Sequence, residues 1–195
     1  FAEARTVVLL GEDPQRTSGD GRDAWITAVH EAGHAVTAAL LGIPFVQATV
    51  QGVGSTAGFV EHLGTQGFAT EDSLSRMLEM TLGGRAAESI LAEPSDGVQS
   101  DFEHATELAA RMIQLGLVDG TIFAVPEEGR KEFMLRHREK IEGILSNRMT
   151  AARTLLTRHR IALEAVAEAL RTQKVLFEAD IRAIIAEREG GADGK

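Results

Sequence analysis

Charged side chains are nearly absent from the first long apolar segment of the chain, residues 24–60, in which only Glu31 is charged. The opening part of this segment, AWITAVHEAGHAVTAALLG, has the length and apolar character of a helix. Gly42 and Pro44 predict where this helix ends. Residues 1–23 include the polar, Gly-rich stretch GEDPQRTSGDGRD and are therefore expected to form an N-terminal segment and a linker into the main body.

Two short stretches after this helix are typical of β-strands. Pro44–Gln51 and Ala57–His62 are joined by the Gly-rich sequence GVGST and predict a small antiparallel pair. An exposed strand edge can bind an extended peptide through backbone hydrogen bonds. The second strand is therefore a candidate substrate-binding edge, with a purely structural hairpin as the alternative. The candidate edge residues are Gly58, Phe59, Val60 and Glu61.

The rest of the chain has the apolar spacing of helices. Thr70 precedes a long regular apolar pattern and is the predicted N-cap of that helical segment. Ser100 and Glu103 have the spacing of a capping box, which predicts the start of another helix. Charged helical sequence follows over 130–171, and a last helix is predicted over 178–188. Three apolar residues of the charged stretch are expected to face the core: Phe133, Leu135 and Ile141.

These elements and the composition indicate one folded domain. Of the 195 residues, 44% are hydrophobic and 25% are charged, close to globular averages. The predicted fold class is mostly α: a helical domain over 24–189 with a small antiparallel β pair and a C-terminal helical bundle. Residues 190–195 are expected to be a flexible tail. Polar residues interrupt the apolar stretch 24–46, so no membrane segment is expected.

The charge and the cysteine content exclude several kinds of function. The chain has no Cys, which excludes disulfide scaffolds, thiol catalysis and zinc bound by cysteine. Its formal net charge of −9 argues against nucleic acid as a partner, because phosphate binding requires a basic face.

The sequence His30-Glu31-Ala32-Gly33-His34 matches H-E-x-x-H, a motif of zinc peptidases. Residues four apart share one face of a helix, so His30 and His34 can bind the same ion. Glu31 lies about 100° further around the helix axis, where its carboxylate can act as base toward a metal-activated water. A carboxylate in an otherwise uncharged helix also requires compensation, which a metal site provides.

A catalytic zinc site usually has three protein ligands and one open position. Asp101 begins the apolar stripe of its predicted helix and is expected to point inward, which makes it a candidate third ligand, with a helix-dipole partner as the alternative. Glu88 competes with it, because it stands in the small-residue sequence GGRAAE, and is interpreted as a supporting or surface residue. Gly83 and Gly84 predict a close contact with another helix.

Three linked motifs resemble the peptidase domain of FtsH-type ATP-dependent zinc metalloproteases: HEAGHAV, LGGRAAES at 82–89 and SDFEHATELAARM at 100–112. The C-terminal sequences ARTLLTRHRIALEAVAEAL and FEADIRAII are similar to the helical end of that family, so the resemblance covers about 24–188. It implies a mostly helical domain with one Zn²⁺ per chain. The implied metal ligands are His30, His34 and Asp101, and the implied base is Glu31.

The predicted activity is that of a zinc metalloendopeptidase, which hydrolyses peptide bonds in unfolded or flexible polypeptides with a metal-activated water and a glutamate base. The alternative is a catalytically silent FtsH-like adaptor, a pseudoprotease. The resemblance implies a homo-hexamer, with a monomer or dimer as the alternative. It also implies a separate or upstream AAA+ motor, since the sequence contains no G-x-x-x-x-G-K-[ST] motif. The expected location is the cytoplasm, with membrane association through an upstream region as the alternative.

Overall fold

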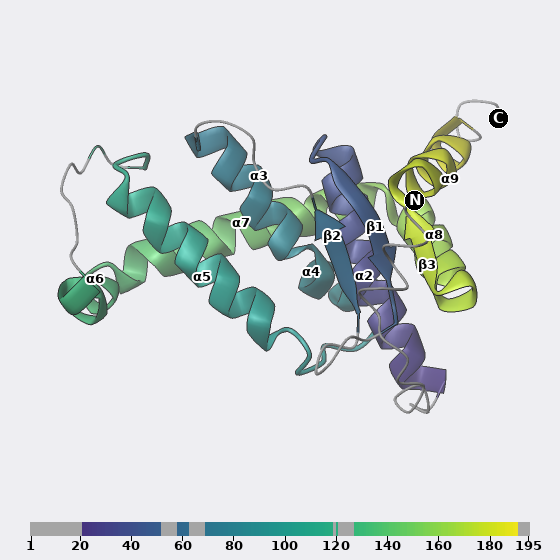
Figure 1. Cartoon of the computed structure of the whole chain (residues 1–195), viewed down its shortest axis with the longest axis horizontal. Helices are drawn as coiled ribbons and strands as arrows, with labels where there is room; N and C mark the ends of the chain where they lie inside the picture. The colour runs from purple at the N-terminus through teal and green to yellow at the C-terminus, as the bar shows by residue number, and fades with distance from the viewer. Residues whose placement is uncertain (1–20, 52–57, 63–68, 119, 121–126, 191–195) are drawn as a thin grey trace.

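The computed structural model describes residues 21–51, 58–62, 69–118, 120 and 127–190. The described helices are α2 (Gly21–Leu40), α3 (Glu71–Thr81), α4 (Gly83–Leu91), α5 (Gln99–Gln114), the 3-10 turn η2 (Glu127–Gly129), α6 (Arg130–Arg136), α7 (Arg138–Arg158), α8 (Arg160–Gln173) and α9 (Glu178–Gly190). The described strands are β1 (Phe45–Thr49), β2 (Phe59–His62) and β3 (Val175–Phe177). The fold is mostly α with one small antiparallel sheet, as the sequence predicts (Figure 1).

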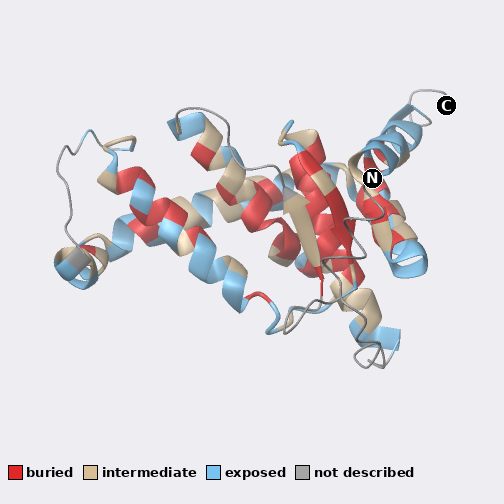
Figure 2. Ribbon diagram, in the orientation of Figure 1, coloured by how far each residue is buried: buried red, intermediate tan, exposed pale blue. Residues whose placement is uncertain are grey.

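Helix α2 is packed on several sides by other elements. It contacts α4, α8, α9 and strand β1, and Figure 1 shows it crossing behind the sheet. From Ala28 to Ala39 every residue except His30 is buried (Figure 2). A helix enclosed in this way must be apolar on all faces. Burial therefore explains why Glu31 is the only charged residue of the segment.

The sheet has the strand order β2-β1-β3 and is antiparallel throughout. The predicted pair is present, with Thr49 opposite Phe59 in β1 and β2. The third strand was missed, because β3 comes from the far end of the sequence and places Val175 opposite Thr49 on the other side of β1. Lys174 adopts a left-handed conformation (φ 70°) that ends α8 and leads into β3. Within the described residues, β2 is thus an edge strand.

Two predicted helical stretches are divided in the structure. The pattern that was expected to form one helix after residue 70 is broken at Leu82, which ends α3 and begins α4. The stretch 130–171 is broken at His137 and His159 into α6, α7 and α8. The apolar spacing continues across these breaks, so it gives no signal of where one helix ends and the next begins.

The two predicted N-caps have opposite outcomes. Thr70 caps α3 as predicted: its hydroxyl accepts from the backbone N–H of Ser73 at 3.1 Å, and the Ser73 hydroxyl accepts from the backbone N–H of Thr70 at 2.9 Å. The capping box of Ser100 and Glu103 is wrong. The N-cap of α5 is Val98, two residues earlier, so the helix begins at Gln99, and the Gln99 side-chain amide donates to the Glu103 carboxylate at 3.0 Å.

Buried apolar side chains form two clusters. The larger surrounds α2 and joins it to the sheet, α4, α8 and α9, while the smaller joins α3, α5, α6 and α7. Phe133 and Ile141 belong to the smaller cluster, as predicted. Leu135 was expected there but is 68% exposed. Two residues correspond to about 200° of helix rotation, so Leu135 faces away from the side on which Phe133 is buried.

The described helices extend slightly beyond the predicted domain limits, because α2 begins at Gly21 and α9 ends at Gly190. Most of the predicted terminal segments, 1–23 and 190–195, lies outside the described residues. None of the described helices has both the length and the hydropathy that a membrane span requires.

Candidate metal centre

Two imidazoles project from the same face of α2. His30 and His34 stand one helical turn apart, and their Nε2 atoms are 3.0 Å from each other. The rings meet edge to face, with centroids 4.7 Å apart. The helix alone therefore brings two nitrogen atoms to one point, as the four-residue spacing predicts.

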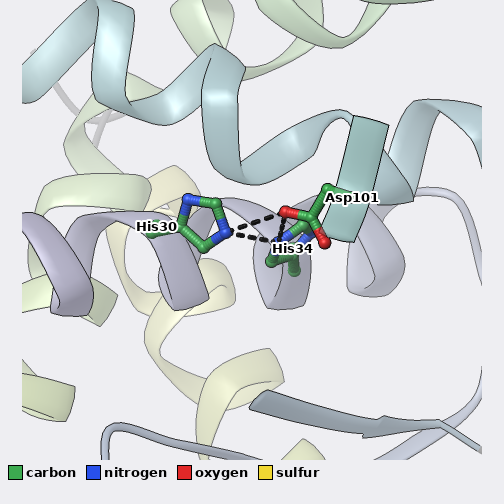
Figure 3. Close-up of side chains that lie close together, drawn as sticks. All are labelled: His30, His34 and Asp101. Carbon is green, nitrogen blue, oxygen red and sulfur yellow. Dashed lines mark hydrogen bonds and ion pairs between the residues drawn. The ribbon is translucent and has the colours of Figure 1, made fainter. Parts of the chain in front are cut away.

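Asp101 reaches the same point from the first turn of α5. Its Oδ2 lies 2.9 Å from Nε2 of His30 and 3.2 Å from Nε2 of His34 (Figure 3). The three potential ligand atoms all lie within 4.8 Å of one another, a separation at which one ion can contact all three. The inward direction expected for Asp101 from the phase of its helix is therefore what the structure has.

The second ring nitrogen of each histidine is held by a separate acceptor. Nδ1 of His30 lies 2.8 Å from Oε1 of Glu88, and Nδ1 of His34 lies 2.8 Å from the backbone carbonyl of Met80. These contacts orient both rings so that the Nε2 atoms face Asp101. Sequence reasoning missed Met80, because the contact is made by a backbone carbonyl and the pattern of side chains does not indicate where such a carbonyl will point.

Glu88 is fully buried, so the surface interpretation of this residue is wrong. Besides His30, its carboxylate accepts hydrogen bonds from Arg85 Nη1 at 3.1 Å, from the backbone N–H of Ser95 at 2.9 Å and from the Ser95 hydroxyl at 3.0 Å. A buried carboxylate with this many donors is stable in its charged form. The geometry therefore agrees with a supporting position behind His30 and not with a surface one.

The hydrogen bonds between these groups shift their pKa values strongly. Burial lowers the pKa of His30, but hydrogen bonds to Asp101 and Glu88 outweigh burial and raise the pKa to about 10. Burial raises the pKa of Asp101, but hydrogen bonds to His30 and His34 outweigh it and hold the pKa well below its usual range. For Glu88, burial is likewise outweighed by the hydrogen bond to His30, which lowers the pKa. Two ionised carboxylates therefore flank His30 and favour positive charge there.

Glu31 adjoins His30 in sequence, and its carboxyl group interacts with both histidines and with Asp101 through charge. The residue is 5% exposed, and burial raises the pKa of its carboxyl group, against the opposing effect of the two histidines. Its Oε2 has no hydrogen-bond partner among the described residues. An unsatisfied buried oxygen is costly. The described residues therefore leave an acceptor position of this buried carboxylate unused.

Close packing of α2 against α4 depends on three glycines. A Cβ on Gly33 would lie 2.3 Å from the carbonyl oxygen of Gly83, and a Cβ on Gly83 would lie 2.7 Å from that of Gly33. A Cβ on Gly84 would lie 2.5 Å from Cε1 of His30 and 2.6 Å from Nε2 of His34. Real Cβ atoms do not approach other atoms this closely. The predicted helix contact at Gly83 and Gly84 is confirmed, and its partner is the helix of the two histidines.

A cavity of about 260 Å³ opens beside the three converging side chains. Of the predicted substrate edge, Gly58, Phe59 and Val60 line it together with Glu31. The fourth edge residue, Glu61, is not in its lining and accepts a hydrogen bond from Gln47 Nε2 at 3.3 Å. Strand β2 therefore runs along the cavity next to the H-E-x-x-H helix.

Three further aromatic or imidazole side chains, those of His104, Trp25 and His159, are not among the three converging groups. His104 lines the cavity but is exposed and has no hydrogen-bond partner among the described residues. Trp25 is half-buried against the larger core and donates from Nε1 to the Leu91 carbonyl at 3.3 Å, so it packs α2 against the end of α4. His159 pairs with Glu189 near the C-terminus of α9.

A helix with H-E-x-x-H whose imidazoles meet a carboxylate from a second helix defines the class of helical metallopeptidase domains. The sequence profile of peptidase family M41 matches residues 19–184, and the chain belongs to this family. It is a peptidase domain of FtsH type, as its three motifs predict.

Curated relatives match nearly the whole chain. ATP-dependent zinc metalloprotease FtsH of Methylococcus capsulatus is 28% identical over 96% of this chain and 33% of that protein. ATP-dependent zinc metalloprotease FtsH 4 of Sorangium cellulosum is 30% identical over 97% of this chain and 33% of its own length. ATP-dependent zinc metalloprotease YME1L1 of Homo sapiens is 27% identical over 91% of this chain and 24% of its own length. The chain thus spans about a quarter to a third of the length of these relatives.

Proposed function

We propose that this chain is a zinc metalloendopeptidase that hydrolyses peptide bonds in unfolded or flexible polypeptides. The observation that carries the proposal is the convergence of Nε2 of His30, Nε2 of His34 and Oδ2 of Asp101 within 4.8 Å, beside the buried carboxylate of Glu31. Relatives named as zinc metalloproteases support the same metal and the same class of reaction. The proposal includes one zinc ion per chain.

The donor set suits zinc. Two imidazole nitrogens and one carboxylate oxygen are three ligands of the kinds zinc prefers, and they leave the fourth tetrahedral position open. The contacts of His30 with Glu88 and of His34 with the Met80 carbonyl are those that orient histidine ligands and strengthen their binding. When bound, zinc polarises a water molecule and the peptide carbonyl.

Glu31 is the proposed base. Its carboxylate lines the same cavity and would take the proton of the attacking water, and no hydrogen bond among the described residues occupies its Oε2. Because burial raises the pKa of Glu31, the group accepts a proton more readily than an exposed carboxylate does. The protonated carboxyl group then donates to the leaving amine. The adaptor alternative would require a missing ligand or base, and all four side chains are present.

Strand β2 is the proposed binding edge for the substrate. One edge of β2 is unpaired among the described residues, and Phe59 and Val60 line the cavity. Backbone hydrogen bonds to a strand edge depend little on the substrate sequence. This mode of binding fits extended, unfolded polypeptide better than any particular folded protein.

The assembly and the motor are also proposals. Since the relatives are named as ATP-dependent and the chain covers a quarter to a third of them, we propose an ATPase module outside this chain and a ring of six peptidase domains. A closed ring requires two different contact patches on each subunit. Light scattering at micromolar concentration tests the proposed ring of six. A mass of six subunits supports the ring, and a single-subunit mass that is unchanged on concentrating contradicts it.

Cleavage of an unfolded protein, with and without chelator, tests the proposed reaction. The zinc-loaded chain should cleave, chelation should abolish cleavage, and added zinc should restore it. The Glu31→Gln variant should retain zinc and lose cleavage. Zinc-loaded protein that binds unfolded polypeptide without cleaving it would support the adaptor alternative instead.

A further inference from the structure

Gly58, the residue immediately before β2, lies against the carboxylate of Glu31. A Cβ on Gly58 would lie 2.8 Å from Cγ and 2.8 Å from Oε1 of Glu31, and 2.7 Å from the carbonyl oxygen of Thr49. The φ of Gly58 is not in the left-handed region, so lack of space, and not backbone torsion, is what excludes a side chain here.

Of these two neighbours, Thr49 has less freedom to move. It is fully buried in the central strand, where it pairs with Phe59 on one side and Val175 on the other. Its hydroxyl also donates to the Lys174 carbonyl at 3.1 Å. The Glu31 carboxylate, in contrast, is the end of a flexible side chain. An added Cβ would therefore displace this carboxylate, whereas its contact with the Thr49 carbonyl would remain and would require a small shift of the Gly58 backbone.

We infer that Gly58 is a positioning residue for Glu31, whose carboxylate rests against the bare Cα of Gly58 at the wall of the metal-binding cavity. The same backbone continues into β2, the proposed substrate edge. The position of the base and the position of the substrate strand thus depend on a single stretch of chain. The inference rests on the proposed function only for the role of Glu31 as base.

A four-protein cycle tests the contact: the unchanged chain, Gly58→Ala, Glu31→Ala and the double variant. The first readout is thermal unfolding without metal. The loss of melting temperature caused by Gly58→Ala should be clearly smaller in the Glu31→Ala background, because the Cγ and Oε1 atoms that the methyl group would meet are then gone. This comparison requires neither zinc nor activity.

The second readout is the affinity of the zinc-loaded proteins for a peptide hydroxamate, which chelates the metal and donates a hydrogen bond to a neighbouring carboxylate. Gly58→Ala should weaken binding by about 10- to 100-fold, as loss of a hydrogen bond to a charged group does. Glu31→Ala should weaken it similarly, and the double variant should be no weaker than Glu31→Ala alone.

Gly97→Ala is the matched control. Gly97 lines the same cavity, but a Cβ there would meet only the Ser95 hydroxyl, at an ordinary 3.5 Å. This variant should leave the melting temperature and the hydroxamate affinity unchanged, or nearly so.

Equal losses of melting temperature in both backgrounds, or additive losses of hydroxamate affinity, would overturn the inference. If Gly58→Ala alone does not fold, a folded double variant supports the contact, whereas two unfolded variants show that the Thr49 carbonyl is what excludes a side chain. If Glu31→Ala binds hydroxamate normally, the proposed role of the base fails, and the metal-free comparison still decides the role of Gly58.

Discussion

Gly84→Ala would place a methyl group against both histidines of the metal centre. Its carbon would lie 2.5 Å from Cε1 of His30 and 2.6 Å from Nε2 of His34, whereas ordinary contact begins at 3.4 Å. One or both rings must then move by almost 1 Å, while metal–ligand distances tolerate only about 0.2 Å. We expect zinc affinity to fall more than the roughly 10- to 100-fold that follows loss of a residue behind a ligand.

The cost in stability should be smaller than the cost in zinc binding. Overpacking a tight contact costs about 1–3 kcal/mol, and replacing a helical glycine by alanine gains about 1 kcal/mol. The free energy of unfolding of the metal-free Gly84→Ala variant should therefore fall by about 0–2 kcal/mol. Denaturant unfolding measures this change, and competition with a chromophoric chelator measures the zinc affinity.

Gly143→Ala is the control for Gly84→Ala, because it replaces a helical glycine by alanine without adding a close contact. Gly143 lies in α7, is exposed, and has no atom within 4 Å of the position a Cβ would take. This variant should gain about 0.5–1 kcal/mol in stability and keep its zinc affinity. Unchanged zinc affinity in Gly84→Ala would refute the close approach of α4 to the two imidazoles.

Three further predictions concern the metal and the base. Glu31→Gln should lower kcat by about 10²- to 10⁴-fold, because it removes the proton acceptor while keeping the side-chain size, and a near-normal turnover of unfolded protein would contradict that role. Asp101→Ala should lose zinc on dialysis, whereas Glu88→Ala should weaken zinc binding by about 10- to 100-fold. His104→Ala, on the same cavity wall, should keep its zinc content. If metal analysis showed that Glu88→Ala loses zinc and Asp101→Ala keeps it, the ligand assignment would have to be exchanged. Zinc at 100 times its Kd should raise the free energy of unfolding by about 2.7 kcal/mol, and an unchanged unfolding midpoint would mean that the folded chain does not bind it.

The parts of the site that were predictable from the sequence are those set by helix geometry. The spacing of His30 and His34 places both on one face of a helix, and the phase of Asp101 in its own helix directs it inward. The glycine pair at residues 83–84 indicated a close helix contact, since glycine inside a helix is costly without such a reason. Each of these inferences needs only a single turn or two of regular structure.

Features that depend on distant parts of the chain were not predictable in this way. Strand β3 is only three residues long and forms because β1, far away in sequence, pairs with it. The full burial of Glu88 depends on donors from Arg85 and from Ser95 beyond the end of α4. The capping box at Ser100 failed because a capping sequence has the same local spacing whether or not the helix begins two residues earlier. Long-range packing decides such details.

Zinc-edge anomalous diffraction from crystals of the zinc-loaded chain tests the central claim most directly. We expect one anomalous peak, with His30 Nε2, His34 Nε2 and an Asp101 carboxylate oxygen at about 2.0–2.2 Å and a fourth position not occupied by protein. An ion bound by Glu88 in place of Asp101, a fourth protein ligand, or no peak between α2 and α5 would contradict the account.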